Sequence, residues 1–427
     1  MGIEERQADR LVDLFRLPYV HSFGPAKSRL IVVCLALFAS FSAAPRYSTG
    51  QTQQPVNYPS GGAEFQSAGR GVEHLRITRG HQSDNEATGP WVINLLRVDL
   101  KQVELRLAHA LDEGVGLETT SSMAARYGAI AAVNAGFFRT TGTYRGESAG
   151  VLVLDGKLIS EPIDGRAAFG LIKNALRTEI IFDHLKFNGD VESDRGRRFT
   201  IKGINRPRAS DEMIVYTPEF HRTTLTTPDG IELIARRNKV IRVRDGEGSS
   251  VIPLDGFVIS ASGSARAWAL ANLRVGSRVN LRWKVVPFKS ESAGLWKQAS
   301  FVIGGGPQLI KEGRVAITFE DEKIAANFVS DRHPRTAISR LKDGRILIVT
   351  VDGRQPGISV GMKLPELATL LLEFGGSDGI NLDGGGSTTM VLNGKLVNKP
   401  SDQNGERPVS DALLILPRTL QSKHRMH

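Results

Sequence analysis

Residues 380–390 read INLDGGGSTTM and set one carboxylate, Asp383, directly before three glycines and three hydroxyl side chains. Glycines lack Cβ atoms, so main-chain N–H groups can come close to a ligand oxygen, and Ser387 and Thr388 can add hydroxyl donors. The segment therefore suits an anion held beside a reactive acid. The alternative is a tight structural turn capped by Asp383, because glycine runs usually serve turns.

A second group of reactive side chains lies in residues 331–336, DRHPRT, where Pro334 stiffens the backbone between cationic and titratable residues. An arginine held in this way, Arg335, suits bidentate recognition of a phosphate. A solvated cluster of surface charges is the alternative.

Three further segments carry polar side chains next to strand-like runs or in polar loops. Asp352 ends the apolar run ILIVTVDGR, and Asn134 ends AAVNAGFF. Asp402 and Arg407 lie in the polar loop PSDQNGER at residues 400–407. Asp-Gly and Asn at such places also make ordinary turns.

The elements that position these residues are expected to be mainly short strands. The 45 glycines lie between β-branched runs, which favours strands joined by tight turns. Residues 151–159 (VLVLDGKLI) and 389–397 (TMVLNGKLV) match almost residue for residue, and residues 308–316 (QLIKEGRVA) are a looser copy. Each predicts a hairpin that turns at an Asp-Gly, Asn-Gly or Glu-Gly pair. A glycine-bearing loop precedes each hairpin, and if the similarity is structural the three loops converge on one pocket. The alternative is that hairpins with such turns are simply common.

The pattern predicts an α+β fold, with a β-rich mixed sheet core, a few helices and an inserted β-rich subdomain. Residues 71–418 form the expected main domain, with the insertion at about 180–297 and a tail at 419–427. Short strands are predicted near residues 74–78, 91–100 and 103–110. Helices are predicted at residues 121–127 and 364–374, the second with Pro365 in its first turn and Gly375 after its end.

The chain of 427 residues carries 55 Lys and Arg against 45 Asp and Glu, a net charge of +10, which suits an anionic partner. Nucleic acid is not expected, because the cations form no blocks and only 7% of the residues are aromatic. The nine histidines show no HxH or HxxxH spacing, so zinc is not expected, and no metal-ligand residues and no cofactor are predicted. A magnesium or calcium ion held by a few carboxylates stays an open alternative.

The N-terminal part predicts export. Residues 1–45 are interpreted as a leader with a signal-peptide core at 30–44, and an uncleaved anchor is the alternative. Any membrane association is expected only through this segment. Residues 46–70, rich in Ser, Gly, Gln and Pro, are interpreted as a flexible linker. The only cysteine, Cys34, lies in the apolar run, so disulfides, thiolate catalysis and cysteine-bound zinc are not expected in the processed protein. We expect a periplasmic, cell-envelope or extracellular protein.

Taken in order, NAGFF, GVLVLDGKL, GGGPQLI, PRTA, VDGRQ, NLDGGGSTTMVLNG and PSD resemble the phosphodiester glycosidase family, over roughly residues 131–415. The resemblance implies hydrolysis of the glycosyl C1–O bond of a sugar phosphodiester, such as an N-acetylglucosamine-1-phosphodiester. Chemistry at that bond needs a carboxylate near the anomeric carbon and cations around the departing phosphate. The expected substrate is an anionic sugar phosphate or polysaccharide.

On this basis Asp383 is the expected nucleophile or general base, Asp352 the second carboxylate, and Arg335 the phosphate-binding cation. The expected substrate-binding residues are Asn134, Asn381, Gly384, Gly385, Gly386, Ser387, Thr388, Asp402 and Arg407. Two other functions stay open: a non-catalytic envelope module that binds anionic glycans, and a metal-dependent phosphodiesterase that breaks the P–O bond.

Overall fold

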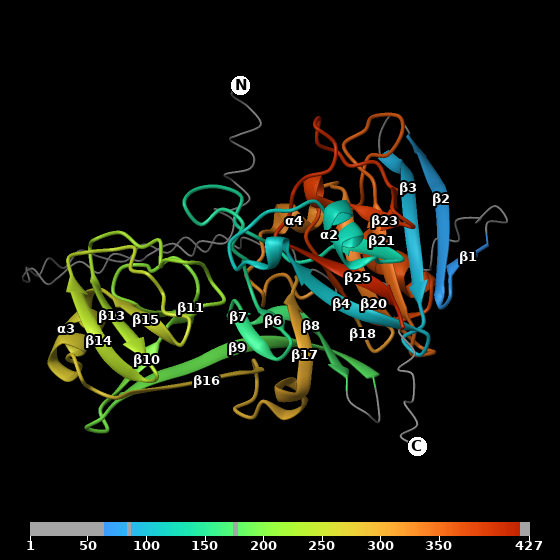
Figure 1. The fold of residues 1–427 in the computed structure, drawn as a ribbon. Coiled ribbons are helices and arrows are strands. Elements are labelled where there is room, and N and C mark those ends of the chain that lie inside the picture. The colour runs from blue at the N-terminus through green and yellow to red at the C-terminus, as the bar shows by residue number, and fades with distance from the viewer. Residues whose placement is uncertain (1–63, 83–86, 174–177, 419–427) are drawn as a thin grey trace, which may run out of the picture.

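The computed structural model describes residues 64–82, 87–173 and 178–418 of the chain. The apolar run at 30–44, most of the predicted linker and the tail at 419–427 lie outside these residues. Among the residues described, no helix is both long and apolar enough to cross a membrane. The fold is strand-rich with a few helices, which confirms the predicted β-rich α+β class (Figure 1).

The largest sheet has eight strands and carries most of the segments predicted to hold reactive side chains. In spatial order its strands are β1 (Gln66–Gly69), β2 (Val72–Gln82), β3 (Ala87–Val98), β21 (Ile346–Val351), β20 (Arg335–Leu341), β22 (Gly376–Asn381), β18 (Gln308–Lys311) and β19 (Arg314–Val315). The strands β20, β21 and β22 are central and antiparallel, so the segments that follow β21 and β22 and precede β20 come to one edge of the sheet.

Two smaller sheets complete the body. The first has five strands in the order β24 (Lys395–Leu396), β23 (Met390–Leu392), β5 (Ala131–Asn134), β25 (Asp411–Pro417) and β4 (Val103–His109). The second has β10 (Arg198–Ile201), β9 (Thr178–Ser193), β8 (Arg166–Lys173), β17 (Ala299–Gly304), β6 (Leu152–Leu154) and β7 (Lys157–Ser160), with β16 (Val279–Pro287) paired to β9.

One apolar core joins these three sheets. It includes Leu96 and Ile348 from the large sheet, Val133 and Leu413 from the five-stranded sheet, and Phe169 from β8, each 0% exposed. The other face of the large sheet is covered by α5 (Leu364–Glu373) and α4 (Ala326–Ser330). Burial of both faces agrees with the sequence of β21, ILIVTV, in which Thr350 is the single polar residue and every residue is buried.

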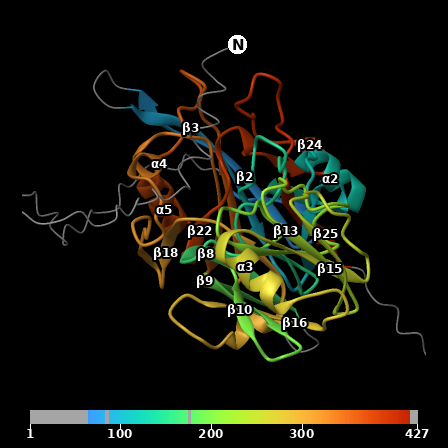
Figure 2. The same ribbon diagram turned by 90° about the vertical axis from the view of Figure 1, so that its left-hand side faces the viewer.

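A separate lobe extends from the body on the left of Figure 1 and faces the viewer in Figure 2. Its sheet has the order β11 (Gly203–Ile204), β12 (Met213–Tyr216), β15 (Gly256–Ala261), β13 (Ile231–Arg236) and β14 (Lys239–Asp245), and α3 (Gly263–Asn272) packs on it. The long strands β9 and β16 connect this lobe to the body. The boundaries predicted for the insertion stay a prediction.

The predicted local elements are present with small differences at their ends. The helix α2 (Thr120–Tyr127) ends at Gly128 in the left-handed conformation, and α5 has Pro365 in its first turn. All three predicted hairpins form, with positive φ at both turn residues in each: 49° and 75° at Asp155-Gly156, 50° and 71° at Glu312-Gly313, and 50° and 74° at Asn393-Gly394. These are the angles of the hairpin turns that Asn-Gly and Asp-Gly favour.

Candidate active site

Asp383 lies two residues after the end of β22, where the chain leaves the large sheet and enters a short 3₁₀ turn at Gly385–Ser387. Its main-chain N–H donates to the Ala135 carbonyl at 3.0 Å, just after the end of β5. The Gly384 N–H donates to the Asp383 carboxylate at 2.9 Å. The main chain at Asp383 is therefore held between the ends of β22 and β5, and its carboxylate accepts from the next residue of the loop.

Asn134, the last residue of β5, holds the two ends of this loop together. Its Nδ2 donates to the Asp383 carbonyl at 2.7 Å, and its Oδ1 accepts from the Thr389 N–H at 3.1 Å and the Thr336 hydroxyl at 2.8 Å. The side chain is fully buried. Asn134 thus contacts the loop itself, and its predicted contact with a sugar stays a prediction.

At each of the three glycines, an added Cβ atom would lie close to a neighbouring protein atom. A Cβ on Gly384 would lie 2.7 Å from the Pro334 carbonyl, and one on Gly386 would lie 2.1 Å from both Arg407 Nη2 and Asp402 Oδ1. Gly385 has φ +60° and would place a Cβ 3.2 Å from Arg354 Nη2. The loop therefore has no room for side chains because protein groups press on it from both sides.

The loop amides differ from the expectation that they face a bound anion. The N–H groups of Gly385, Ser387 and Thr388 donate to the carbonyls of Pro334, Gly384 and Gly385 at 2.9, 3.1 and 3.2 Å. Ser387 and Thr388 are both 1% exposed. These three amides already donate to carbonyls of the loop and of Pro334. Cationic side chains are therefore better placed than these amides to bind an anion.

Two guanidinium groups flank the glycine loop. Arg407 forms a bidentate ion pair with Asp402, with Nε–Oδ2 at 2.7 Å and Nη2–Oδ1 at 3.0 Å, and this pair rests on Gly386. Arg354, an exposed residue two positions after Asp352, lies against Gly385. The predicted grouping of Asp383, the glycines, Asp402 and Arg407 is therefore present, and Arg354 is an addition.

Burial raises the pKa of Asp383 to about 6. The Ser387 hydroxyl and the Arg407 guanidinium act in the opposite direction, and the Asp411 carboxyl raises the pKa further. A carboxyl group that titrates near neutral pH can exchange a proton or act as a nucleophile under ordinary conditions.

Asp411, at the start of β25, was not among the predicted site residues. Its Oδ1 accepts from the Gly136 N–H at 2.6 Å, and its Oδ2 accepts from the Ser410 hydroxyl at 2.7 Å. The main chain of Ala135 connects the two acids, because its N–H donates to the Asp411 carbonyl and its carbonyl accepts from Asp383. Burial raises the pKa of Asp411 as well, with the nearby His109 acting to lower it.

Asp352, the predicted second carboxylate, is 3% exposed and holds a neighbouring segment. Its Oδ1 accepts from Asn398 Nδ2 at 3.2 Å, and its two oxygens lie 3.2 and 3.1 Å from the Lys399 N–H. Asn398 Nδ2 also donates to the Thr388 carbonyl at 3.0 Å. Burial raises the pKa of Asp352. Through these contacts Asp352 holds residues 398–399 and, by way of Asn398, the end of the glycine loop. The catalytic role of Asp352 stays a prediction.

Arg335 is 1% exposed and donates to main-chain carbonyls rather than to an acid. Its Nε contacts the Met362 carbonyl at 2.9 Å, and its Nη2 contacts the carbonyls of Phe328 and Asp331 at 2.8 Å each. Burial lowers its pKa to about 9. The guanidinium braces the backbone just before β20 through Nε and Nη2, and its predicted phosphate contact stays a prediction.

Asn381 is also fully buried, and its Nδ2 donates to the Gly306 carbonyl at 2.9 Å. The Gly306 N–H donates in return to the Asn381 carbonyl at 2.8 Å, and the Gly304 N–H donates to the Val151 carbonyl at 2.7 Å. These bonds join the glycine loops before the three hairpins into one continuous region. The first two loops line one small pocket and Gly384–Gly386 are not in its lining, so the convergence of all three loops on one pocket stays a prediction.

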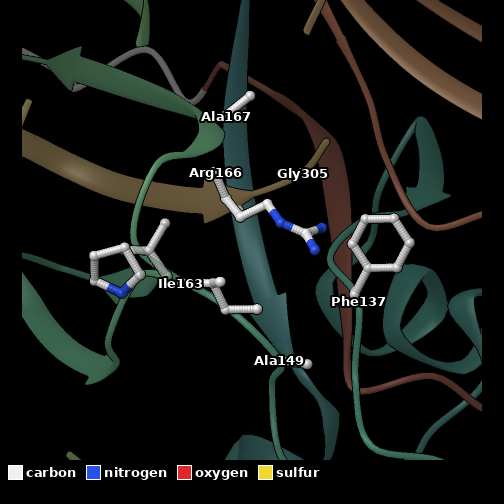
Figure 3. A pocket seen from close by; sticks show the side chains of 10 residues that line it. Phe137, Ala149, Ile163, Arg166, Ala167 and Gly305 are labelled. Carbon is white, nitrogen blue, oxygen red and sulfur yellow. The ribbon is translucent and has the colours of Figure 1, made fainter. Parts of the chain in front are cut away.

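A small pocket lies where the first two glycine loops meet (Figure 3). Arg166 reaches across it toward the ring of Phe137, and Ile163, Ala149 and Gly305 form its walls. Its enclosed space of about 10 Å³ is no more than one water molecule needs. A sugar ring does not fit there, so this pocket is not a candidate for the sugar site.

Residues 229–416 match the family model described as phosphodiester glycosidase, and the match begins inside the predicted insertion. The chain is 32% identical over 181 residues to the mouse N-acetylglucosamine-1-phosphodiester alpha-N-acetylglucosaminidase, covering 40% of this chain and 33% of the mouse protein. It is 24% identical over 258 residues to an uncharacterized Rickettsia conorii protein, covering 58% of this chain and 84% of that protein.

The fold has a close structural counterpart. The crystal structure of a candidate exported protein from Burkholderia pseudomallei superposes with a TM-score of 0.74 and 22% identity, covering 86% of this chain and 99% of the other. At that identity the likeness concerns the fold alone. The matched region spans about a third of the length of the mouse enzyme.

Proposed function

Residues 229–416 of this chain belong to the phosphodiester glycosidase family, and on that premise we propose that the protein hydrolyses the glycosyl C1–O bond of a sugar phosphodiester. The observation that carries the proposal is the grouping of Asp383, whose pKa is about 6, with Arg407 and Arg354 on the two sides of one glycine loop. An acid with cations on the same loop matches a substrate that has an electrophilic carbon next to a phosphate.

Asp383 acts in this proposal as the nucleophile or as the base that activates water. The pKa of about 6 leaves the carboxylate mostly ionised at neutral pH while it remains basic enough to accept a proton. A phosphate is a good leaving group, so the bond breaks without a strong general acid. The role of Asp411 is electrostatic, because its carboxyl group raises the pKa of Asp383.

Arg407 and Arg354 bind the departing phosphate. Arg407 is oriented by its bidentate pair with Asp402, which fixes the plane of the guanidinium beside Gly386. Arg335, Asp352 and Asn134 hold the backbone behind this arrangement through the contacts described above.

The proposed substrate is an N-acetylglucosamine-1-phosphodiester or a related sugar phosphate in an envelope polymer. The relative in mouse is named for action on an N-acetylglucosamine-1-phosphodiester. The proposed location outside the cytoplasm follows from the apolar run at residues 30–44.

The test is incubation of the protein with UDP-N-acetylglucosamine and with a glycosylated teichoic-type polymer in ¹⁸O-labelled water. Cleavage at the C1–O bond puts the label in the sugar, and cleavage of the P–O bond puts it in the phosphate. Label in the phosphate would favour the phosphodiesterase alternative.

The variant Asp383→Asn separates an enzyme from a binding module. We expect turnover to fall by at least about 10³-fold, equivalent to about 4 kcal/mol of lost transition-state stabilisation. The matched control is Asp343→Asn, an exposed acid paired with Arg345. Unchanged product formation by Asp383→Asn would contradict the assignment, and polymer binding without turnover in the wild type would favour the binding module.

A further inference from the structure

Three surface turns meet at the outer end of the inserted lobe. They are residues 193–197 between β9 and β10, residues 236–239 at the tip of the β13–β14 hairpin, and residues 274–278 after α3. The Val279 N–H donates to the Asn238 carbonyl and the Val240 N–H to the Ser277 carbonyl, both at 2.9 Å, and Ser193 pairs with Val279. The three turns are therefore side by side, far along the lobe from the body (Figure 1).

The turns present a dense group of exposed cations, called here the cationic turn cluster. Its members are Arg195, Arg197, Arg236, Arg237, Lys239, Arg274 and Arg278. Asp255 pairs with Arg236 at 2.7 Å and with Arg237 at 3.5 Å. Among the described residues no ion pair involves the other five, and Asp194 is the one acid on the turns themselves. Most of the positive charge is therefore available to an outside anion.

At the tip of the β13–β14 hairpin, Arg237 has a positive φ, which is unfavourable for an arginine. Arg237 and Asn238 have φ of 45° and 62°, as this kind of two-residue turn requires. Asn and Gly are the residues that favour such angles, and an arginine there is strained by about 1 kcal/mol. Strained residues gather at functional positions. Arg237 is exposed at this turn, which agrees with a role in binding.

We propose that the cationic turn cluster binds the repeated phosphates of an anionic glycan polymer and so holds that polymer while its sugars reach the Asp383 site. This inference rests on the proposed function and names the partner of the inserted lobe. Arg166, at the pocket beside the site, pairs with Leu185 on β9, and Ser193 follows eight residues later on that strand. At 3.3 Å per residue the cluster lies about 26 Å further along β9, so only a polymer spans both places.

A polyphosphate glycan fits these turns better than nucleic acid or a membrane. The turns carry no aromatic side chain on which a base could stack. Val275 is the one apolar residue on them, so they offer little to insert into lipid. Arginine side chains bind phosphate through charge and hydrogen bonds, so these turns need no aromatic or apolar residue to bind a polyphosphate glycan.

The experiment measures binding of fluorescent poly(glycerol phosphate) to the full chain at several salt concentrations. The test variant carries Arg195→Gln, Arg197→Gln and Arg278→Gln. The matched control carries Lys311→Gln, Arg314→Gln and Lys342→Gln, which removes the same charge from exposed positions on the body. Each phosphate contact releases roughly one counterion, so the slope of log affinity against log salt should fall by about 2 to 3 in the test variant.

We expect the affinity of the test variant to fall at least tenfold and that of the control to change less than threefold. The KM for a long glycosylated polymer should rise in the test variant, while kcat and the turnover of UDP-N-acetylglucosamine stay unchanged. Equal binding by both variants, or tighter binding of duplex DNA or anionic vesicles than of the polymer, would overturn the inference. If the protein binds the polymer through these turns but cleaves no glycosyl phosphate, the proposed function is wrong and the inference that the cationic turn cluster binds the polymer still holds.

Discussion

Asp383 is a carboxyl group whose surroundings favour its protonated form, and this has a consequence for stability. Its pKa in the folded protein, about 6, lies above the ordinary value of 3.8, so the folded state binds a proton more tightly than the unfolded state. The favourable contribution is complete below about pH 4 and is lost as the pH rises through 6. At neutral pH the ionised group opposes folding by up to about 3 kcal/mol.

We therefore predict that Asp383→Asn raises the free energy of unfolding at pH 7.5 by about 1–3 kcal/mol while it abolishes turnover. Asparagine can still accept the Gly384 N–H, so the loop should persist. Denaturant unfolding at pH 7.5 and at pH 4 checks this, with the gain present only at the higher pH. A variant that is less stable than the wild type at pH 7.5 would contradict the burial argument.

Asp411 gives a prediction about the pH dependence of activity. Its carboxyl raises the pKa of Asp383, whereas Arg407 and Ser387 lower it, so Asp411→Asn should lower the pKa of Asp383. The acid limb of kcat/KM, where Asp383 becomes protonated, should then move to lower pH. A pH–rate profile checks the direction, with Asp343→Asn as the control. An acid limb that stays in place would show that the two acids are not coupled.

At the scale of elements, local patterns predicted local structure well. The Asp-Gly, Glu-Gly and Asn-Gly hairpins and the helix with Pro365 in its first turn depend on neighbouring residues, and they are present. The electrostatic influence of Asp411 on Asp383 depends on β25 pairing with β5, nearly 280 residues earlier in the chain, which no local pattern reveals. Arg354 is close to Gly385 for a similar non-local reason.

The glycine loop gives a prediction at this scale. In Gly386→Ala the new Cβ would lie 2.1 Å from Arg407 Nη2 and Asp402 Oδ1, so the ion pair must move. We expect kcat/KM to fall at least 30-fold, or about 2 kcal/mol. The control is Gly357→Ala, which has open space around its Cβ and strains only a surface turn at φ +73°. Similar activity of the two variants would mean that Arg407 can move without loss.

At the scale of the whole molecule, the inserted lobe is docked on the body. Tyr144 of the body donates its hydroxyl to the Thr224 carbonyl at 3.0 Å and packs its ring on Phe220 with 5.8 Å between centroids. On the other side of the contact, Arg206 of the lobe pairs with Glu161 at 2.5 Å. The lobe thus touches the loop that carries Glu147 and Ser148, and Ser148 lies 3.4 Å from Asp411.

We predict that Tyr144→Ala lowers the free energy of unfolding by about 1–3 kcal/mol and speeds proteolysis in residues 217–229. Tyr144→Phe keeps the ring contact and loses one hydrogen bond, so it should cost about 1 kcal/mol or less. Limited proteolysis with mass spectrometry and denaturant unfolding check both variants. Equal protection of the segment in all three proteins would show that the lobe is held by other contacts.

The chain enters the inserted lobe along β9 and returns along β16, and these two strands are antiparallel neighbours over nine residue pairs. The entry and exit points therefore lie next to each other, and lengthening, shortening or exchanging the lobe leaves the register of the body strands unaltered. The lobe can therefore change as a unit without a change in the strands that position Asp383.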